Sequence, residues 1–306
     1  MPLGKPVQSY TAPSAHNSPG DKATDFELSE PKYSLGDIIL DTETRSEINA
    51  LISHKRDHTL VFERMGFSST HKYSKRFVVN FYGEPGTGKT IAAHAIAKEF
   101  RKKILLIDYS QIESKYVGDT PKNLKRVFDF AKLESCVIFF DEADAILSKR
   151  VTSMQSSTDT SVNQTRSVML NILNEFDGDI IFATNFISNY DSAFMRRISK
   201  HVKFNLPDYA IRKELFEKYI PGCMSDNIDI DELAGISAGL SAADIENSTL
   251  MAAFSAASES RLSVTTHDIN KQISLIKESK RQNASNHTNL ASRHVPEDYV
   301  EQQLRI

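Results

Sequence analysis

The most constraining feature of the sequence is a glycine-rich octapeptide, Gly83-Glu84-Pro85-Gly86-Thr87-Gly88-Lys89-Thr90, which fits the pattern GxxxxGK[ST] in full. It follows an apolar run and precedes residues with helical spacing, so it is expected to join a buried strand to a helix. Glycines let successive backbone N–H groups turn toward one anion, and the helix N-terminus adds positive potential there. The octapeptide therefore predicts a phosphate-binding loop in which Lys89 reaches the β- and γ-phosphates and the Thr90 hydroxyl ligates Mg²⁺.

Five short apolar runs, rich in Val, Ile and Phe, recur along the first two thirds of the chain. Runs this short suit strands that are buried on both faces, and the segments between them space their apolar residues as helices do. This alternation predicts an α/β fold with a doubly wound, five-stranded parallel sheet. The predicted strands are residues 77–82, 104–108, 137–140, 180–183 and 202–204.

Composition divides the chain into four segments. Residues 1–37 are polar and punctuated by prolines, so they cannot bury enough apolar surface to offset ordering entropy and are expected to form a flexible arm. Residues 38–206 carry the strand and helix pattern of a nucleotide-binding domain, beginning with a helix that Asp41 or Thr42 can cap. Strand signals stop after residue 206, and residues 207–277 predict a small all-helical domain. Residues 278–306 are polar and are expected to form a C-terminal tail.

Charge and cysteine content narrow the functional classes. There are 37 Lys and Arg against 40 Asp and Glu, a net charge of -3, which argues against a general nucleic-acid coating protein. Two cysteines cannot form a disulfide framework or a four-thiolate zinc site. No apolar run approaches the ~20 residues that a membrane span needs, and the first residues lack an apolar signal core. The sequence therefore predicts a cytoplasmic protein with no membrane partner.

An acidic pair follows the third predicted strand. Asp141 would hold Mg²⁺ through its water shell, and Glu142 would polarise the attacking water as a general base. An Asp followed directly by a Glu indicates hydrolysis rather than transfer of the phosphoryl group to another substrate.

With these motifs in this order, residues 38–277 resemble an AAA ATPase. Thr184-Asn185 lies where the family carries its sensor Asn, which would orient the lytic water. Arg196-Arg197 resembles the arginine-finger segment, and the adjacent pair is most similar to the spastin and katanin branch. An arginine finger acts from a neighbouring subunit and stabilises transition-state charge. Residues 42–67 resemble the helix that leads into the AAA module of bacterial-type single-ring proteins.

Three further segments extend the resemblance. Gly239-Leu240-Ser241-Ala242-Ala243-Asp244 resembles the second-sensor segment, with Ala rather than Arg at position 243, so Gly239 and Ala243 are expected near the nucleotide. Lys115, Tyr116 and Val117 resemble the aromatic pore loop with which substrate-threading relatives grip an extended polypeptide. Residues 151–163 would form a second pore-facing loop. Asp179 departs from the family, which often has an aromatic residue after Asp-Gly.

The resemblance implies a homo-oligomeric ring, with six subunits expected, that binds ATP and Mg²⁺. Hydrolysis at the subunit interfaces would remodel or thread a protein substrate, with an adaptor or a protease supplied by a separate partner. Two other hypotheses remain open: an ATP-gated scaffold with little turnover, and a nucleic-acid-acting loader that uses basic clusters such as Arg101-Lys102-Lys103. A GTPase is excluded, because the sequence has no Asn-Lys-x-Asp motif to read the base.

Overall fold

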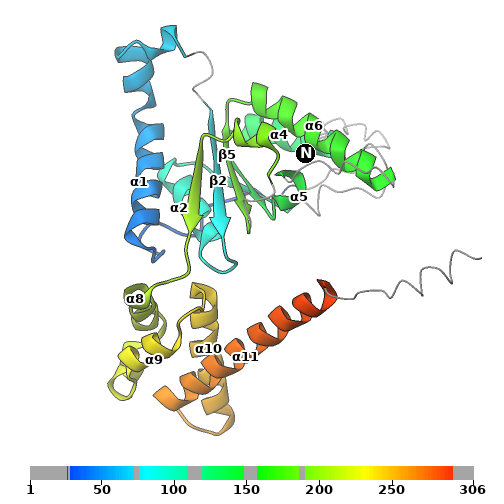
Figure 1. The fold of residues 1–306 in the computed structure, drawn as a ribbon. Helices are drawn as coiled ribbons and strands as arrows, with labels where there is room; N and C mark the ends of the chain where they lie inside the picture. Colours follow the sequence, from blue (N-terminus) through cyan, green and yellow to red (C-terminus); the bar gives the residue numbers. More distant parts are fainter. Residues whose placement is uncertain are drawn as a thin grey trace, which may run out of the picture.

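A six-stranded sheet in the order β1-β3-β4-β5-β2-β6 organises the first two thirds of the chain (Figure 1). The computed structural model describes residue 26 and residues 28–71, 76–108, 119–147, 157–185 and 190–291. All five predicted strands are present and pair in parallel, so the predicted fold class is confirmed. Their bounds are β2 Phe77–Gly83, β3 Ile104–Asp108, β4 Val137–Asp141, β5 Asp179–Thr184 and β6 Lys200–Phe204.

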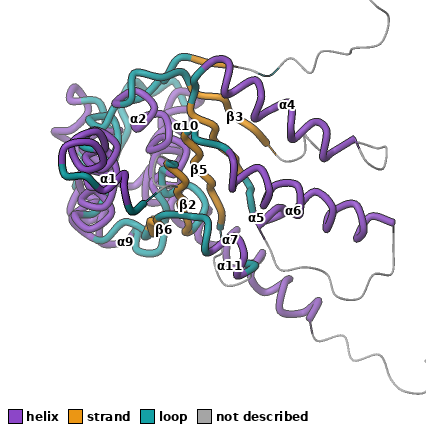
Figure 2. Tube along the Cα trace, turned by 90° about the horizontal axis from the view of Figure 1, so that it is seen from above, coloured by secondary structure: helices purple, strands orange, loops and turns teal. Residues whose placement is uncertain are grey.

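The sheet is covered by helices on both faces (Figure 2). On one face, alternate strand residues such as Ile138 and Phe140 pack under α4, α5, α6 and α7. On the other face, Val79 and Phe139 pack under α1 and α2. The near-continuous apolar runs of the sequence follow from this double burial. The helices are α1 Thr42–Arg56, α2 Lys89–Glu99, α4 Asp119–Glu134, α5 Asp144–Leu147, α6 Ser157–Glu175 and α7 Ser192–Met195.

The segment before α1 is more ordered than the prediction of a flexible arm over residues 1–37. Leu28–Ser29 form β1, which pairs with β3 in antiparallel fashion at the edge of the sheet. Further along, Ile38 is buried in the core of the α/β unit, whereas Ile39 packs against the core of the helical unit. Composition missed this order because the few apolar residues here are held by neighbours distant in sequence.

The first helix also differs from its predicted extent. Asp41 caps α1 by accepting from the backbone N–H of Thr44, as one of the two predicted caps would. The helix ends at Arg56, and Leu60–Arg64 continue as the π-helix η1, followed by the 3₁₀ turn η2 at Phe67–Ser69. The helix expected over residues 42–67 is therefore divided into differently wound segments.

A bundle of helices follows β6 and has its own buried core, which includes Phe216, Leu233 and Ile269. A capping box at Ser241 and Asp244 starts α10. The described elements are α8 Tyr209–Tyr219, the 3₁₀ turn η3 Gly222–Asn227, α9 Ile230–Ile236, α10 Ala242–Ser258 and α11 Thr266–Ala291.

The expected boundary between helical domain and tail, at residues 277 and 278, is wrong, because α11 continues to Ala291. Polar character alone does not end a helix, and no Gly or Pro interrupts residues 278–291. Lys280, in this extension, pairs with Asp244 at the start of α10. None of the described helices has the length and apolarity to cross a membrane.

A buried carboxylate fixes α1 to the sheet. Asp179, the first residue of β5, is fully buried and forms ion pairs with Lys55 of α1 and with Lys102 at the start of β3, the latter at 2.8 Å. The two lysine side chains keep about a third of their surface in water. The Asp that departs from the family pattern thus has a structural explanation in this chain.

We predict that the two lysines are redundant partners of Asp179. Lys55→Met or Lys102→Met alone leaves one cation on the buried carboxylate, and each change is expected to lower the free energy of unfolding by about 1 kcal/mol or less. The double variant leaves the buried carboxylate of Asp179 without a cation. Its free energy of unfolding is expected to fall by roughly 3–5 kcal/mol, more than the sum of the single changes. Urea denaturation measures all three, with Lys213→Met, in the exposed pair with Asp231, as the control. Additive effects would show that the lysines act independently.

Protonation of a buried histidine predicts a loss of stability in mild acid. His94 of α2 is buried, its Nδ1 accepts from the backbone N–H of Lys32 at 3.4 Å, and Tyr33 stacks edge-on against the ring. Burial, and secondarily the charge of Lys32, lowers the pKa of His94 below its usual 6.5. Stability is therefore full above about pH 6.5 and is lost as the pH falls toward the folded-state pKa.

In His94→Gln, the free energy of unfolding should fall less steeply as the pH decreases. Some pH dependence should remain, because burial also lowers the pKa of His201. The free energy of unfolding between pH 7.5 and 5 measures the effect. The exposed His267→Gln serves as the control. A slope in His94→Gln equal to that of the parent chain would contradict the assignment.

Candidate functional site

The predicted phosphate loop joins β2 to α2, as expected. Gly83 ends β2 where β6 passes so close that a Cβ would lie 2.1 Å from the carbonyl oxygen of Phe204. Gly86, with φ at 75°, is in the left-handed region, and a Cβ there would lie 2.7 Å from the Ser241 hydroxyl oxygen of the helical unit. Both positions therefore require glycine, for close approach in the first case and for conformation and space in the second.

Lys89 points back into this loop. Its Nζ donates to the carbonyl oxygens of Gly83 at 2.7 Å and Glu84 at 3.0 Å, and it lies 3.4 Å from Oδ1 of Asn185. Burial lowers the pKa of Lys89, and the nearby carboxylates of Asp141, Asp144 and Glu84 oppose that shift. The cation is thus held by neutral carbonyls and by the predicted sensor Asn, at the centre of the site.

The acidic edge of the site comes from the ends of β4 and β5. Asp141 is the last residue of β4, and its carboxylate accepts from the backbone N–H of Glu142 at 2.9 Å. Glu142 has a φ of 50° and an exposed side chain. Asn185 follows β5, and its backbone N–H donates to Asp144 at 3.2 Å. Asp144 was not predicted, although it is the third carboxylate in the run that starts at Asp141.

One pocket of about 350 Å³ contains most of the predicted residues. It lies between the α/β unit and the helical unit. Gly83, Glu84 and Thr87 are not in its lining; Thr87 is buried and its hydroxyl donates to the carbonyl oxygen of Glu84 at 2.8 Å, which shapes the loop. The lining residues are Pro85, Gly86, Gly88, Lys89, Thr90, Ile91, Asp141, Glu142, Asn185, Tyr219, Ala242, Ala243 and Glu246.

The helical unit contributes the predicted Ala243, its neighbour Ala242 and two residues that were not predicted, Tyr219 and Glu246. The backbone N–H of Ala243 donates to the carbonyl oxygen of Gly86 at 3.1 Å, which fixes the start of α10 against the phosphate loop. Gly239, also predicted near the nucleotide, lies in the turn before the helix and does not line the pocket. Tyr219 and Glu246 do line it. Sequence patterns gave no sign of them, because Tyr219 packs against the core of the helical unit like an ordinary core residue and Glu246 occupies an exposed helical position.

The two predicted finger residues lie away from this pocket. Arg196 is exposed at the end of α7. Arg197 donates through Nε to Oδ1 of Asn174 at 2.9 Å and through a terminal nitrogen to the carbonyl oxygen of Ala193 at 2.8 Å. Neither guanidinium lines the pocket of its own chain. The predicted pore residues Lys115, Tyr116 and Val117 lie outside the described residues, as do residues 151–156 of the second predicted loop. The rest of that predicted loop, residues 157–163, is instead the start of α6.

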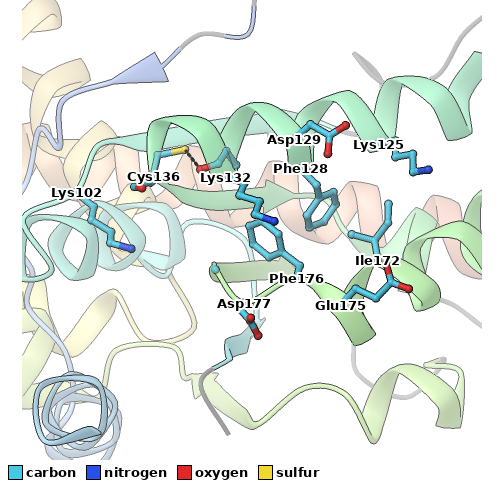
Figure 3. A pocket seen from close by; sticks show the side chains of 13 residues that line it. Lys102, Lys125, Phe128, Asp129, Lys132, Cys136, Ile172, Glu175, Phe176 and Asp177 are labelled. Carbon is cyan, nitrogen blue, oxygen red and sulfur yellow. Dashed lines mark hydrogen bonds between the residues drawn. The ribbon is translucent and has the colours of Figure 1, made fainter. Parts of the chain in front are cut away.

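A second pocket, of about 340 Å³, opens at the opposite ends of the strands, between α4 and α6 (Figure 3). Phe128 and Phe176 meet edge-on in its wall, and lysines and carboxylates surround them. Burial raises the pKa of Cys136 to about 11, so the thiol stays protonated near neutral pH. This pocket therefore lacks a thiolate nucleophile, and it shares no residue with the predicted site.

The pocket between the units has the groups that a magnesium nucleotide requires. The glycine cradle and Lys89 suit an anion, while the Thr90 hydroxyl and the Asp141 carboxylate supply the oxygen ligands that Mg²⁺ prefers. Among the described residues, no cluster of three or more His, Cys, Asp or Glu side chains offers an alternative metal site.

Comparison with known proteins agrees with this geometry. Residues 79–206 match the family described as "ATPase family associated with various cellular activities (AAA)". The proteasome-activating nucleotidase of Saccharolobus solfataricus is 34% identical over 206 residues, which cover 65% of this chain and 52% of the relative. A 26S proteasome regulatory subunit 4 homolog of Dictyostelium discoideum is 34% identical over 201 residues, covering 63% of this chain and 46% of the relative.

The chain spans about half the length of these curated relatives. Their names refer to proteasomes rather than to spastin or katanin, so the branch indicated by the adjacent arginines stays a prediction. The strand order, the loop between β2 and α2, and the family match agree with one another: this chain contains an AAA ATPase domain, at residues 79–206.

Proposed function

We propose that this chain is a Mg²⁺-dependent ATPase that works in a ring of six subunits and couples hydrolysis to remodelling or threading of a protein substrate. The observation that carries the proposal is that Lys89, Thr90, Asp141, Glu142 and Asn185 line one pocket. The names of the relatives, a proteasome-activating nucleotidase and a proteasome regulatory subunit, support a protein substrate and a separate protease partner.

Different residues of the pocket would bind the phosphates and the Mg²⁺ ion. Backbone N–H groups of the glycine loop and the Lys89 ammonium would hold the β- and γ-phosphates. Thr90 and Asp141 would hold Mg²⁺, directly and through water, and the bound ion would neutralise charge on the phosphates. Lys89 would exchange the loop carbonyls that now hold it for phosphate oxygens, which are stronger acceptors.

The hydrolytic step would depend on Glu142 and Asn185. Glu142 is exposed to the pocket and is free of a salt bridge among the described residues, so its carboxylate can accept a proton from an attacking water. Asn185 lies beside Lys89 at the end of β5, where its amide can orient that water. A carboxylate in this place argues against a scaffold with little turnover.

The ring follows from the position of the arginines. Arg196 and Arg197 do not line the pocket of their own chain, and Arg197 is held toward α6. A head-to-tail contact that brings them to the pocket of a neighbouring copy would repeat around an axis and close into a ring. Each guanidinium would then stabilise transition-state charge in a neighbouring site.

The structure gives no comparable support to a nucleic-acid loader. In the basic run at residues 101–103, Lys102 is engaged by the buried Asp179, and Lys103 lies 3.9 Å from Glu30. A charge run whose members face carboxylates of the same chain offers little net positive field to a phosphate backbone.

Glu142→Gln tests the base. We expect nucleotide binding to persist while kcat falls by roughly 10²–10⁴-fold, because the amide cannot take the proton. Calorimetry with ATP and phosphate-release kinetics measure the two properties, and light scattering with ATP reports the ring. The exposed Glu134→Gln, at the end of α4, is the matched control. A Glu142→Gln chain that hydrolyses ATP at the parent rate would remove Glu142 from the chemistry.

Mixing two inactive variants tests whether sites are shared between copies. Glu142→Gln keeps its arginines, and the double variant Arg196→Ala/Arg197→Ala keeps its base, so each alone is expected to lose most activity. In a 1:1 mixture, roughly a quarter of the interfaces combine an intact base with intact arginines, and activity should return in that proportion. Phosphate release measures it. A mixture no more active than its components would show that the arginines act within their own chain or not at all.

A further inference from the structure

The end of the nucleotide pocket contributed by the helical unit holds two polar side chains to which the proposed function assigns no role. Tyr219 is at the last position of α8, and Glu246 is on α10. Glu246 follows Ala243 by three residues, so it lies on the same face of α10, about one turn farther from the phosphate loop that Ala243 contacts. The pair therefore occupies the part of the pocket beyond the phosphate-binding groups.

The side chains of Tyr219 and Glu246 line the same end of the pocket, where the Glu246 carboxylate acts on the Tyr219 phenol. Burial, and then the charge and the hydrogen bond of Glu246, raises the pKa of Tyr219 to about 12, so the phenol keeps its proton near neutral pH. The phenol can therefore donate to a carboxylate such as that of Glu246. The tyrosine ring itself is half-buried, while Glu246 is exposed at the rim of the pocket.

This end of the pocket consequently offers acceptors rather than donors. An ionised carboxylate only accepts hydrogen bonds, and a phenol that donates its proton to such a carboxylate would present only its oxygen lone pairs to a ligand. The other lining side chains from this region, Ile91, Ala242 and Ala243, are apolar. A ligand group that binds here must bring hydrogen-bond donors and tolerate apolar walls.

The negative charge of Glu246 is also unfavourable for binding the phosphates of a nucleotide. A polyanion such as a nucleoside triphosphate is repelled by an added negative charge, so Glu246 would weaken binding unless it makes a compensating contact. The non-phosphate part of a nucleotide carries two kinds of donor, the hydroxyls of the ribose and the exocyclic amine of the base. Both have the chemistry that a carboxylate accepts.

We infer that Glu246, oriented by Tyr219, is a specificity-determining residue that accepts hydrogen bonds from donors of the nucleoside part of the bound nucleotide. The inference rests on the proposed function and deepens it, because it assigns a selective role to the helical unit. In this arrangement Tyr219 would be a positioning residue, with its hydroxyl donating to one carboxylate oxygen and leaving the other for the ligand.

The test compares nucleotides that lack one donor at a time. Binding of ADP, 2′-deoxy-ADP, 3′-deoxy-ADP and purine riboside diphosphate to the full chain is measured by calorimetry, which needs no turnover. Whichever donor Glu246 contacts, the parent chain is expected to bind the analogue that lacks it about tenfold or more weakly than ADP. The two deoxy analogues identify a ribose contact, and the purine analogue identifies an amine contact.

Glu246→Ala is expected to reduce that preference to about twofold or less. Loss of the repulsive charge changes the affinity for every nucleotide by the same factor, so the ratio between ADP and its analogues cancels this general effect. Tyr219→Phe, which keeps the ring and removes the hydroxyl, should give an intermediate ratio. Glu214→Ala, an exposed glutamate of α8 outside the pocket, should keep the parent ratio.

Three results would overturn the inference. The parent chain could bind all four nucleotides equally, Glu246→Ala could keep the parent preference, or Glu214→Ala could lose it to the same extent. If the proposed function itself were wrong, the parent chain would bind neither ATP nor ADP, which distinguishes that outcome from the three results above. Glu246→Gln, which retains one acceptor oxygen without the charge, separates the hydrogen bond from the electrostatic effect if Glu246→Ala folds poorly by circular dichroism.

Discussion

The parallel register of β2, β5 and β4 is the constraint on which the candidate site depends. β5 lies between the other two strands, with Tyr82 opposite Thr184 on one side and Phe140 opposite Phe182 on the other. Because parallel strands end at the same edge, this register brings the phosphate loop, Asn185 and Asp141 together from three separate parts of the chain. A shift of one residue in either pairing would turn the alternating side chains to the opposite face and separate these groups. The apolar cores on the two faces hold that register in place.

The site is completed by a second unit that folds around a different core. The N–H of Ala243 bonds to Gly86, and Ile38 and Ile39 divide between the two cores, so the units meet along the phosphate loop and the segment before α1. At Gly86 this contact leaves no room for a Cβ. Lys280 extends the same connection, since it pairs with the Asp244 carboxylate that also caps α10. The C-terminal helix is thus linked through a cap to the loop that would hold phosphate.

Much of this arrangement could be predicted from local sequence. The octapeptide, the Asp141–Glu142 pair and the five apolar runs each have a pattern that one strand or one turn imposes, and the structure places them as such. What escaped prediction depends on distant neighbours. β1 exists because β3 offers a free edge, Asp179 is tolerated because two lysines from other elements reach it, and Tyr219 and Glu246 matter because two units meet. The end of α11 was missed for another reason, since a polar segment without Gly or Pro resembles a tail in composition but can still extend a helix.

The division of the pocket has a mechanical consequence under the proposed function. The α/β unit supplies nearly all the groups suited to phosphates, whereas Glu246, which we infer to contact the nucleoside, belongs to the helical unit, as does Tyr219 beside it. A nucleotide bound to both units would fix the angle between them. Because the triphosphate and the diphosphate make different contacts with the two units, hydrolysis would change that angle. Arg196 lies on the α/β unit, so a change in angle within one subunit would shift its arginines relative to the next site in the ring. Turnover in one pocket would in this way alter the geometry of its neighbour.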